Sequence, residues 1–306
     1  MIDSIITGDS IEVLKTFPNE FAHAIISDIP YGIGYDEWDV FHDNTNSALG
    51  GTSLAQSNGG TLFKRRGKPL NGWSTADKKI PLEYQEWCAS WASEWLRVLK
   101  PGASCFVFAG RRYAHRCIVA LEDAGFTFKD MIAWKKNTAP HRAQRISEIY
   151  KRRGDIVQAD NWEGWRVANL RPIFEPILWF QKPYKTGGTI ADNVLEFDVG
   201  AWNENALKTY CEPFDVVNHS NILSVPYNKC DHGLHITQKP LSLMKCLVSL
   251  VTRENAIVLD PFAGSGTTCL AAKKLNRHYV GIEINSNYAE IARKRLEYKV
   301  FTLLGD

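Results

Sequence analysis

Residues 257–268 read as a strand, a glycine-rich turn and the start of a helix, with the sequence Ile-Val-Leu-Asp-Pro-Phe-Ala-Gly-Ser-Gly-Thr-Thr. Glycines let a turn approach a ligand closely, and the free N–H groups of a helix start favour a carboxylate or phosphate. Glu283 follows about twenty residues later, after the next apolar run, where an acid can accept both hydroxyls of a ribose. This spacing predicts an adenosyl cofactor on a parallel sheet.

A second apolar run, residues 21–26, reads as a buried parallel strand and leads into Ser-Asp-Ile-Pro-Tyr-Gly at 27–32. In open α/β sheets, ligands bind at the carboxyl ends of the strands. A carboxylate, a carbonyl preceding proline and an aromatic ring could together grip a flat base that carries an amino group. The alternative is an ordinary Asp-x-Pro turn.

The remaining pattern alternates between strands and helices, which predicts a mostly parallel sheet with helices on both faces. Ser10 is expected to cap the first helix, and the tryptophans spaced by four after Pro81 are expected to pack in the core. Pro172, Pro176 and Pro183 place the strand between them at an edge or a bulge. Expected strands are 4–7, 104–108, 126–134, 173–180, 256–259 and 279–282. Expected helices are 11–15, 81–99, 111–124 and 241–252, one from the glycine turn to 275, and a last one after the strand at 279–282 that ends at about 298.

Composition is that of a soluble globular protein, with 44% hydrophobic and 23% charged residues among 306. No apolar run approaches the roughly 20 residues that span a bilayer, and Asp3 and Asp9 interrupt any signal peptide. Seven cysteines without a Cys-x-x-Cys pair argue against disulfides and structural zinc. This cysteine usage fits a reducing, cytoplasmic location. Cys230, His232 and His235 lack a fourth ligand, so no metal site is predicted.

Three motifs carry a resemblance to a known family. Asp28 to Tyr31 (Asp-Ile-Pro-Tyr) looks like the Asp-Pro-Pro-Tyr motif of S-adenosylmethionine-dependent amino-methyltransferases that act on DNA. Residues 260–268 are similar to their cofactor motif, and 235–240 (His-Ile-Thr-Gln-Lys-Pro) to a third block. The catalytic motif precedes the cofactor motif, which resembles the β-class of N6-adenine and N4-cytosine enzymes. The resemblance implies a Rossmann-like methyltransferase sheet, circularly permuted in motif order and mostly parallel with an antiparallel edge strand.

The resemblance also implies roles for the catalytic motif. The Asp28 carboxylate and the Ile29 carbonyl would accept hydrogen bonds from the target amine, and Tyr31 would stack on a base flipped out of the duplex. Ile29 stands where the family usually has proline, but any residue supplies the carbonyl. Pro30 stiffens the turn, and Tyr35 and Trp38 are candidate pocket walls with core or loop packing as the alternative.

The implied cofactor is S-adenosylmethionine. Asp9 would accept from its adenine amine or, alternatively, form a turn with Ser10. His235 would lie near the cofactor carboxylate with Lys239, or else belong to a helix entry in which Thr237 is the cap. The implied cofactor-binding set is Asp9, His235, Thr237, Lys239, Pro240, Asp260, Phe262, Ala263, Gly264, Ser265, Gly266, Thr267, Glu283 and Asn285.

The net charge of +2 implies no polyanionic partner, but basic residues gather in mid-chain and would suit double-stranded DNA. We expect a catalytic half at 1–136 with a mobile loop at 41–80, target-recognition insertions at 137–233 around an edge strand near 173–182, and a cofactor-binding half at 234–306. The candidate DNA-binding residues are Arg142, Arg145, Lys151, Arg152 and Arg153.

Family resemblance favours adenine as the target, because aspartate rather than serine precedes the Pro-Tyr turn. The first alternative is N4-cytosine methylation. A protein-glutamine methyltransferase, a catalytically decayed nucleic-acid-binding module and an NAD-dependent oxidoreductase fit the residues less well. The resemblance makes a homodimer plausible, whereas a cognate restriction enzyme is a partner that the sequence leaves open.

Overall fold

The computed structural model describes residues 2–31, 75–136, 143–167, 170–225 and 238–297. The strands in these ranges form one eight-stranded sheet in the order β1-β8-β7-β2-β3-β5-β4-β6. Their bounds are β1 (Ser4–Thr7), β2 (Ala22–Asp28), β3 (Leu99–Phe108), β4 (Thr127–Lys135), β5 (Phe174–Gln181), β6 (Ile222–Ser224), β7 (Ile257–Asp260) and β8 (His278–Glu283).

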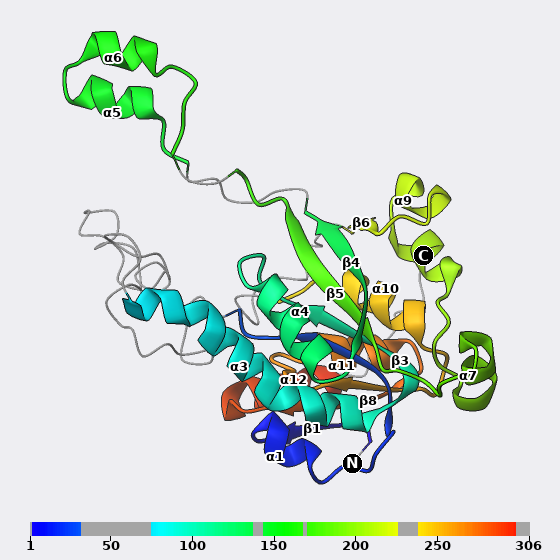
Figure 1. The fold of residues 1–306 in the computed structure, drawn as a ribbon. Coiled ribbons are helices and arrows are strands. Elements are labelled where there is room, and N and C mark those ends of the chain that lie inside the picture. Colours follow the sequence, from blue (N-terminus) through cyan, green and yellow to red (C-terminus); the bar gives the residue numbers. More distant parts are fainter. Residues whose placement is uncertain (1, 32–74, 137–142, 168–169, 226–237, 298–306) are drawn as a thin grey trace.

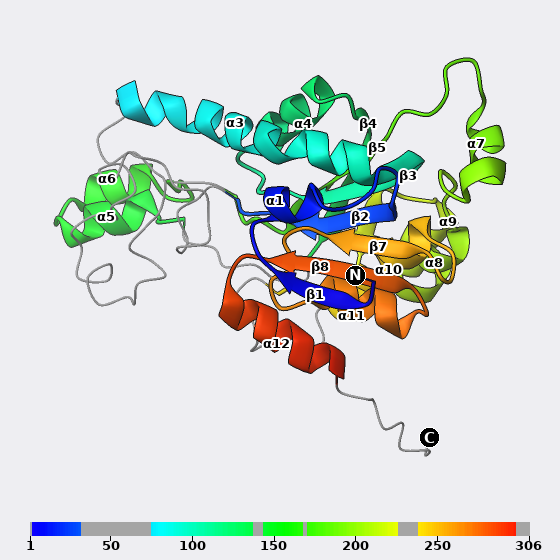
Figure 2. The ribbon, with the colours of Figure 1, turned by 90° about the horizontal axis from the view of Figure 1, so that it is seen from below.

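Helices cover both faces of this sheet, as the alternation predicts (Figures 1 and 2). Helices α1, α3 and α4 pack on one face, and α10, α11 and α12 on the other. Successive residues of β2 show why: Ile25 faces the first core, whereas Ala24 and Ile26 face the second. The helices are α1 (Ser10–Leu14), α3 (Thr75–Val98), α4 (Ala114–Asp123), α5 (Ile146–Arg152), α6 (Ile156–Asn161), α7 (Ile190–Phe197), α8 (Glu204–Tyr210), α9 (Pro213–Val217), α10 (Leu241–Val251), α11 (Thr267–Lys274) and α12 (Ser286–Glu297).

Strand β5 corrects one expectation. It is antiparallel to β3 and β4, as the family pattern implies, but it lies between them rather than at an edge. The last pair between β3 and β5 joins Phe108 to Ile177. Pro176 lies one residue beyond that pair and is paired with Ala133 of β4, which is why a proline is tolerated there. Strand β6, parallel to β4, forms the edge instead.

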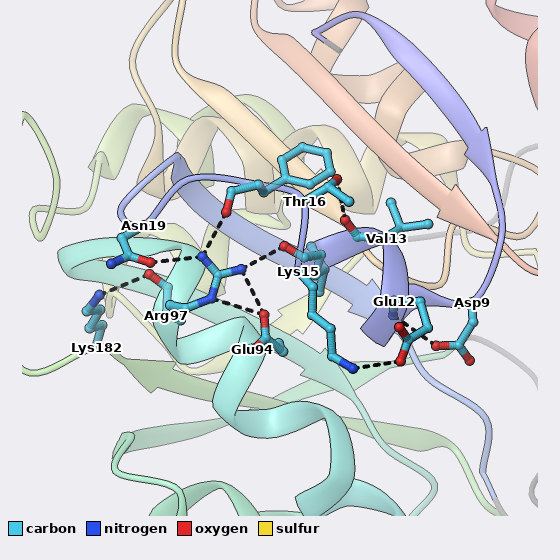
Figure 3. A network of polar contacts seen from close by, with 11 residues as sticks. Asp9, Glu12, Val13, Lys15, Thr16, Asn19, Glu94, Arg97 and Lys182 are labelled. Carbon is cyan, nitrogen blue, oxygen red and sulfur yellow. Dashed lines mark hydrogen bonds and ion pairs between the residues drawn. The ribbon is translucent and has the colours of Figure 1, made fainter.

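The N-terminal helix is capped by Asp9, not by Ser10 as expected. The Asp9 carboxylate accepts from the backbone N–H groups of Ile11 and Glu12 at 2.9 and 3.2 Å (Figure 3). Aspartate and serine are comparable caps, so the pair Asp9-Ser10 leaves the start ambiguous by one residue. The other end of α1 is tied to α3 by Arg97, whose guanidinium donates to the Leu14 carbonyl at 2.6 Å.

Helix α3 begins at Thr75 and contains Pro81, so the expected helix start at 81 and the expected loop at 75–80 are both wrong. The rest of the predicted loop, 41–74, lies outside the described residues. Trp91 and Trp95 are fully buried, which confirms the predicted core stripe. In the part of the chain that the structure describes, no helix is long and apolar enough to cross a membrane.

The expected target-recognition insertions at 137–233 contain short helices on both sides of β5. Helices α5 and α6 pack as a hairpin that stands away from the sheet, and its two ends meet at a β-bridge between Arg145 and Arg166 (Figures 1 and 2). Helices α7, α8 and α9 follow β5. Helices this short carry too few turns for a clear hydrophobic period, which is why the sequence pattern misses them.

Candidate active site

Strands β1, β8, β7 and β2 run parallel, so their carboxyl ends gather at one edge of the sheet. Thr7 pairs with Glu283, Asp260 pairs with Gly281, and β7 lies beside β2. The catalytic and glycine-turn motifs therefore end neighbouring strands, β2 and β7. Ser27 and Asp260 join them directly, since the serine hydroxyl donates to the Asp260 carboxylate at 2.7 Å.

The glycine turn depends on backbone that only glycine adopts easily. Gly264 and Gly266 have φ angles of 52° and 76°. An added Cβ at Gly266 would lie 2.9 Å from the Cβ of Ala292, so α12 packs directly on the turn. The turn is held close to β8, because Glu283 accepts from the Gly264 N–H at 2.8 Å and from the Asn285 N–H at 2.8 Å. Burial raises the pKa of Glu283.

Several predicted cofactor residues hold the turn together. Arg295 of α12 donates to the Ser265 carbonyl at 2.5 Å, to the Ser265 hydroxyl at 3.0 Å and to the Thr267 hydroxyl at 3.2 Å. The Asn285 side chain accepts from the N–H groups of Asn287 and Tyr288 and so caps α12. These three side chains thus have structural partners, and their contact with a cofactor stays a prediction.

Phe262 and Ala263 lie in the turn, between the end of β7 and Gly264. The Phe262 ring packs against Trp87, Trp91 and Trp95 with centroid distances of 5.7, 6.1 and 5.9 Å. Ala263 is buried, and its N–H donates to the Ile282 carbonyl at 2.8 Å. Both residues anchor the turn to the core.

Asp260 and Asp9 lie near this end as well. Burial raises the pKa of Asp260 to about 7, and the hydrogen bond from Ser27 opposes that rise only in part. Asp9 follows β1, one residue after Gly8, whose N–H donates to the Glu283 carbonyl at 3.0 Å. Asp9 therefore lies beside the end of β8, and its predicted contact with adenine remains untested.

At the end of β2, the two oxygens of Asp28 have different surroundings. Oδ2 accepts from the Lys239 ammonium at 2.6 Å, whereas Oδ1 is buried with no partner among the described residues. Burial raises the pKa of Asp28, and the charge of Lys239 opposes this rise. Ile29 is buried, and the Pro30 carbonyl accepts from the Tyr84 hydroxyl at 3.0 Å, which fixes the turn.

Tyr31 packs against Gly110, where an added Cβ would lie 3.0 Å from the tyrosine side chain. Its hydroxyl donates to Glu175 of β5, and burial holds the pKa of Tyr31 well above its usual value, so this donor stays protonated. Lys239 lies 5.3 Å from the centroid of the Tyr31 ring. The tyrosine is therefore held by Gly110 near its Cβ, by Lys239 over its ring and by Glu175 at its hydroxyl.

Glu175 is a member of the site that sequence reasoning missed. Besides Tyr31, it contacts the Lys239 ammonium at 3.1 Å and that of Lys136. Burial alone would raise the pKa of Glu175, but the two ammonium groups outweigh burial and lower it to about 2. An acid inside an apolar strand was the available signal, because buried carboxylates are almost always paired.

The structure places the remaining predictions as follows. Lys239 contacts Asp28 and Glu175, and Pro240 is buried at the start of α10. The predicted DNA contacts Arg145, Lys151, Arg152 and Arg153 are exposed on the α5–α6 hairpin. Residues Tyr35, Trp38, Arg142, Cys230, His232, His235 and Thr237 lie outside the described residues.

Comparison with known proteins agrees with this geometry. A family described as DNA methylase, covering N6 and N4 methyltransferases, matches residues 22–294. Type II methyltransferase M.HindIII from Haemophilus influenzae is 64% identical over 296 residues, which are 97% of this chain and 96% of that protein. Type II methyltransferase M.HpaI from Haemophilus parainfluenzae is 27% identical, over 97% of this chain and 75% of that protein.

Two solved structures share the fold. The M1.HpyAVI–SAM complex is 24% identical with a TM-score of 0.52, over 96% of this chain and 99% of that chain. The PvuII DNA methyltransferase, cytosine-N4-specific, is 17% identical with a TM-score of 0.57, over 98% and 88%. From the family match and the 64% identity, the chain belongs to the DNA methylase family of N6 and N4 methyltransferases.

Proposed function

We propose that this DNA methyltransferase moves the methyl group of S-adenosylmethionine to the exocyclic N6 amine of an adenine flipped out of the duplex. The proposal rests on the hydrogen bonding of the two Asp28 carboxylate oxygens, beside the glycine turn. Lys239 occupies one carboxylate oxygen, and the other, Oδ1, is buried without a described partner. A buried acceptor without a partner is costly, and a bound amine would satisfy it.

The acceptor residues would act by orienting the amine. An exocyclic amine is a poor nucleophile because its lone pair is delocalised into the ring. Hydrogen bonds from its two N–H groups to the Asp28 carboxylate and the Ile29 carbonyl would favour a tetrahedral nitrogen with a localised lone pair. Most of the rate enhancement would come from this positioning and from preorganised charge. Tyr31 would stack on the base.

The residues at the ends of β7 and β8 fit the cofactor. When bound, S-adenosylmethionine supplies an electrophilic methyl group on a sulfonium. Glu283 uses each oxygen once, for Gly264 and Asn285, and a carboxylate has about four lone-pair sites, so acceptor capacity remains for ribose hydroxyls. The turn around Gly264 and Gly266 would hold the methionine tail. The other residues of the predicted cofactor set would line the same pocket, except Lys239, which pairs with Asp28 and Glu175 instead.

Target recognition would belong to the insertions between the two halves. The proposed division is a catalytic half at 1–136, recognition insertions at 137–233 and a cofactor-binding half at 234–306, although β5 and β6 belong to the sheet. The exposed basic residues of the α5–α6 hairpin would contact phosphates, which position a protein without specifying sequence. A homodimer, a cognate restriction enzyme and a cytoplasmic location are further parts of the proposal, the last two suggested by a relative named a type II methyltransferase from a bacterium.

The test is to incubate the protein with unmethylated duplex DNA and methyl-labelled S-adenosylmethionine, then to separate the labelled nucleosides. Label in N6-methyladenine is the expected result. Label in N4-methylcytosine would instead show that cytosine is the target base. Absence of label from both DNA and RNA would overturn the proposed activity.

A further inference from the structure

A buried chain of alternating charges extends from Asp28 away from the glycine turn. Asp28 contacts Lys239 at 2.6 Å, Lys239 contacts Glu175 at 3.1 Å, and Glu175 contacts Lys136. The side chains of Lys239 and Glu175 are only 5% and 10% exposed. The four residues come from the end of β2, the segment before α10, strand β5 and the residue after β4.

Such a chain is expensive to build for stability alone. Moving an ion out of water costs several kcal/mol, and well-packed apolar residues of similar volume are often at least as stabilising as a buried ion pair. Here two carboxylates face two ammonium groups, so the four charges cancel only while all four are present. Removing either central residue, Lys239 or Glu175, leaves an uncompensated charge next to the acceptor site.

The contacts of the two central residues suggest what the chain does. Lys239 holds Oδ2 of Asp28 and thereby leaves Oδ1 as the oxygen for an incoming amine. Glu175 holds Lys239 and also accepts the hydroxyl proton of Tyr31 in a hydrogen bond. The Glu175 carboxylate is thus linked both to Asp28, through Lys239, and to Tyr31, the ring that is expected to stack on the base.

We propose that Lys239 and Glu175 are positioning residues of the acceptor site: Lys239 fixes the orientation and charge of Asp28, and Glu175 fixes Lys239 and Tyr31. The inference deepens the proposed function and rests on it. Neither residue is assigned to contact the substrate.

The two residues act on Asp28 with opposite signs. Among the residues that the structure describes, the charged or titratable groups that act on Asp28 are Lys239, Glu175, Tyr31 and Asp260. The Lys239 charge lowers the pKa of Asp28, whereas the Glu175 charge raises it. Removing the lysine charge should therefore raise the pKa of Asp28, and removing the glutamate charge should lower it. A loss of packing alone would not produce opposite shifts from two neighbouring residues.

The first measurement follows the Asp28 carboxyl directly, by carbon NMR of labelled aspartates over a pH series, with the signal assigned by its loss in Asp28→Asn. Lys239→Met should raise the apparent pKa of Asp28, Glu175→Gln should lower it, and Lys239→Arg should leave it nearer the wild-type value. Lys239→Gln serves if the methionine variant does not fold, which thermal unfolding will show.

Matched controls come from an exposed ion pair of α8. Lys208 and Glu204 lie 2.6 Å apart with side chains 50% and 52% exposed, away from the site. Lys208→Met and Glu204→Gln make the same chemical changes and should leave the titration of Asp28 unchanged.

The second measurement is the pH dependence of methyl transfer to DNA. The ionised carboxylate is the active form, so the acidic limb should move to higher pH in Lys239→Met and to lower pH in Glu175→Gln. Both variants should lose about 10- to 100-fold in kcat, as expected for misplaced reacting groups, with the KM for S-adenosylmethionine little changed. Lys239→Arg should recover part of the rate.

Shifts in the same direction, or no shift in either variant, would overturn the inference whether or not the protein methylates DNA. A wild-type protein that transfers no methyl group would overturn the proposed function instead. The NMR titration would then still decide whether Lys239 and Glu175 control the charge of Asp28.

Discussion

The two ends of the active site are built by different means. At the cofactor end, the Glu283 carboxylate is held by backbone N–H groups of Gly264 and Asn285, and the turn conformation itself supplies the geometry. At the acceptor end, Asp28 is held by the side chain of Lys239, which is 211 residues away in the chain. The cofactor end should therefore respond to changes in backbone and packing, and the acceptor end to changes in charge.

The largest effect is expected at the acceptor end. Asp28→Asn keeps the shape of the side chain but removes the charge, and it places an amide beside Lys239. We expect kcat to fall about 10²- to 10³-fold, the range seen when one preorganised polar group is removed, while S-adenosylmethionine binds as before. Single-turnover transfer and calorimetry would measure the two quantities.

Asp123→Asn is the matched control, because Asp123 is exposed at the end of α4. It should transfer methyl groups at the wild-type rate. Wild-type turnover in Asp28→Asn would remove Asp28 from the catalytic machinery.

The cofactor end can be tested through Gly266, with Gly154 as control. Both have positive φ angles, 76° and 80°, but an added Cβ meets Ala292 at Gly266 and nothing within 4 Å at Gly154. Gly154→Ala should lower the free energy of unfolding by about 1 kcal/mol from backbone strain alone. Gly266→Ala should cost roughly 1–3 kcal/mol more, from overpacking. Denaturant unfolding would measure both changes in free energy. Equal losses of stability would show that α12 moves enough to accommodate the added methyl group.

Asp260, which accepts a hydrogen bond from Ser27 and so joins the two ends, is expected to make stability depend on pH. The pKa of Asp260 is raised from 3.8 to about 7, so between these values the folded protein keeps a proton that the unfolded chain releases. Wild type should lose stability, relative to Asp260→Asn, as pH rises through this window. Urea unfolding of both proteins on either side of the window would test this. A pH-independent difference between them would mean that Asp260 is ionised throughout.

The smallest effect is expected on the projecting hairpin. Arg145→Ala should weaken DNA binding regardless of sequence and reduce the slope of log affinity against log salt by about 1. Arg253→Ala, which removes an exposed arginine paired with Asp198, should change neither. Unchanged binding by Arg145→Ala across a salt series would place Arg145 outside the DNA interface.

The same contrast explains what the sequence could predict. The cofactor end lies within one strand–turn–helix unit and the next strand, so its spacing already indicates Glu283. Glu175 reaches Lys239, the partner of Asp28, from β5, which lies between β3 and β4, whereas the prolines around β5 suggested an edge or a bulge. The contact is non-local, and the residues on either side of Glu175 do not indicate its partners.

Local ambiguity accounts for the smaller errors. Asp9 and Ser10 are both good helix caps, and the structure selects Asp9. Pro81 suggested a helix start, whereas α3 extends past it to Thr75. The helices of the α5–α6 hairpin are too short to show a hydrophobic period, so only their basic character was visible in the sequence.

The central claim is that donor binding and acceptor positioning depend on different residues. The most direct test measures, in Glu175→Gln, the dissociation constant for S-adenosylmethionine and the single-turnover rate of transfer to DNA. We predict a dissociation constant within about twofold of wild type and a rate lowered about 10-fold or more. A loss of donor affinity as large as the loss of rate would contradict the separation of the two ends.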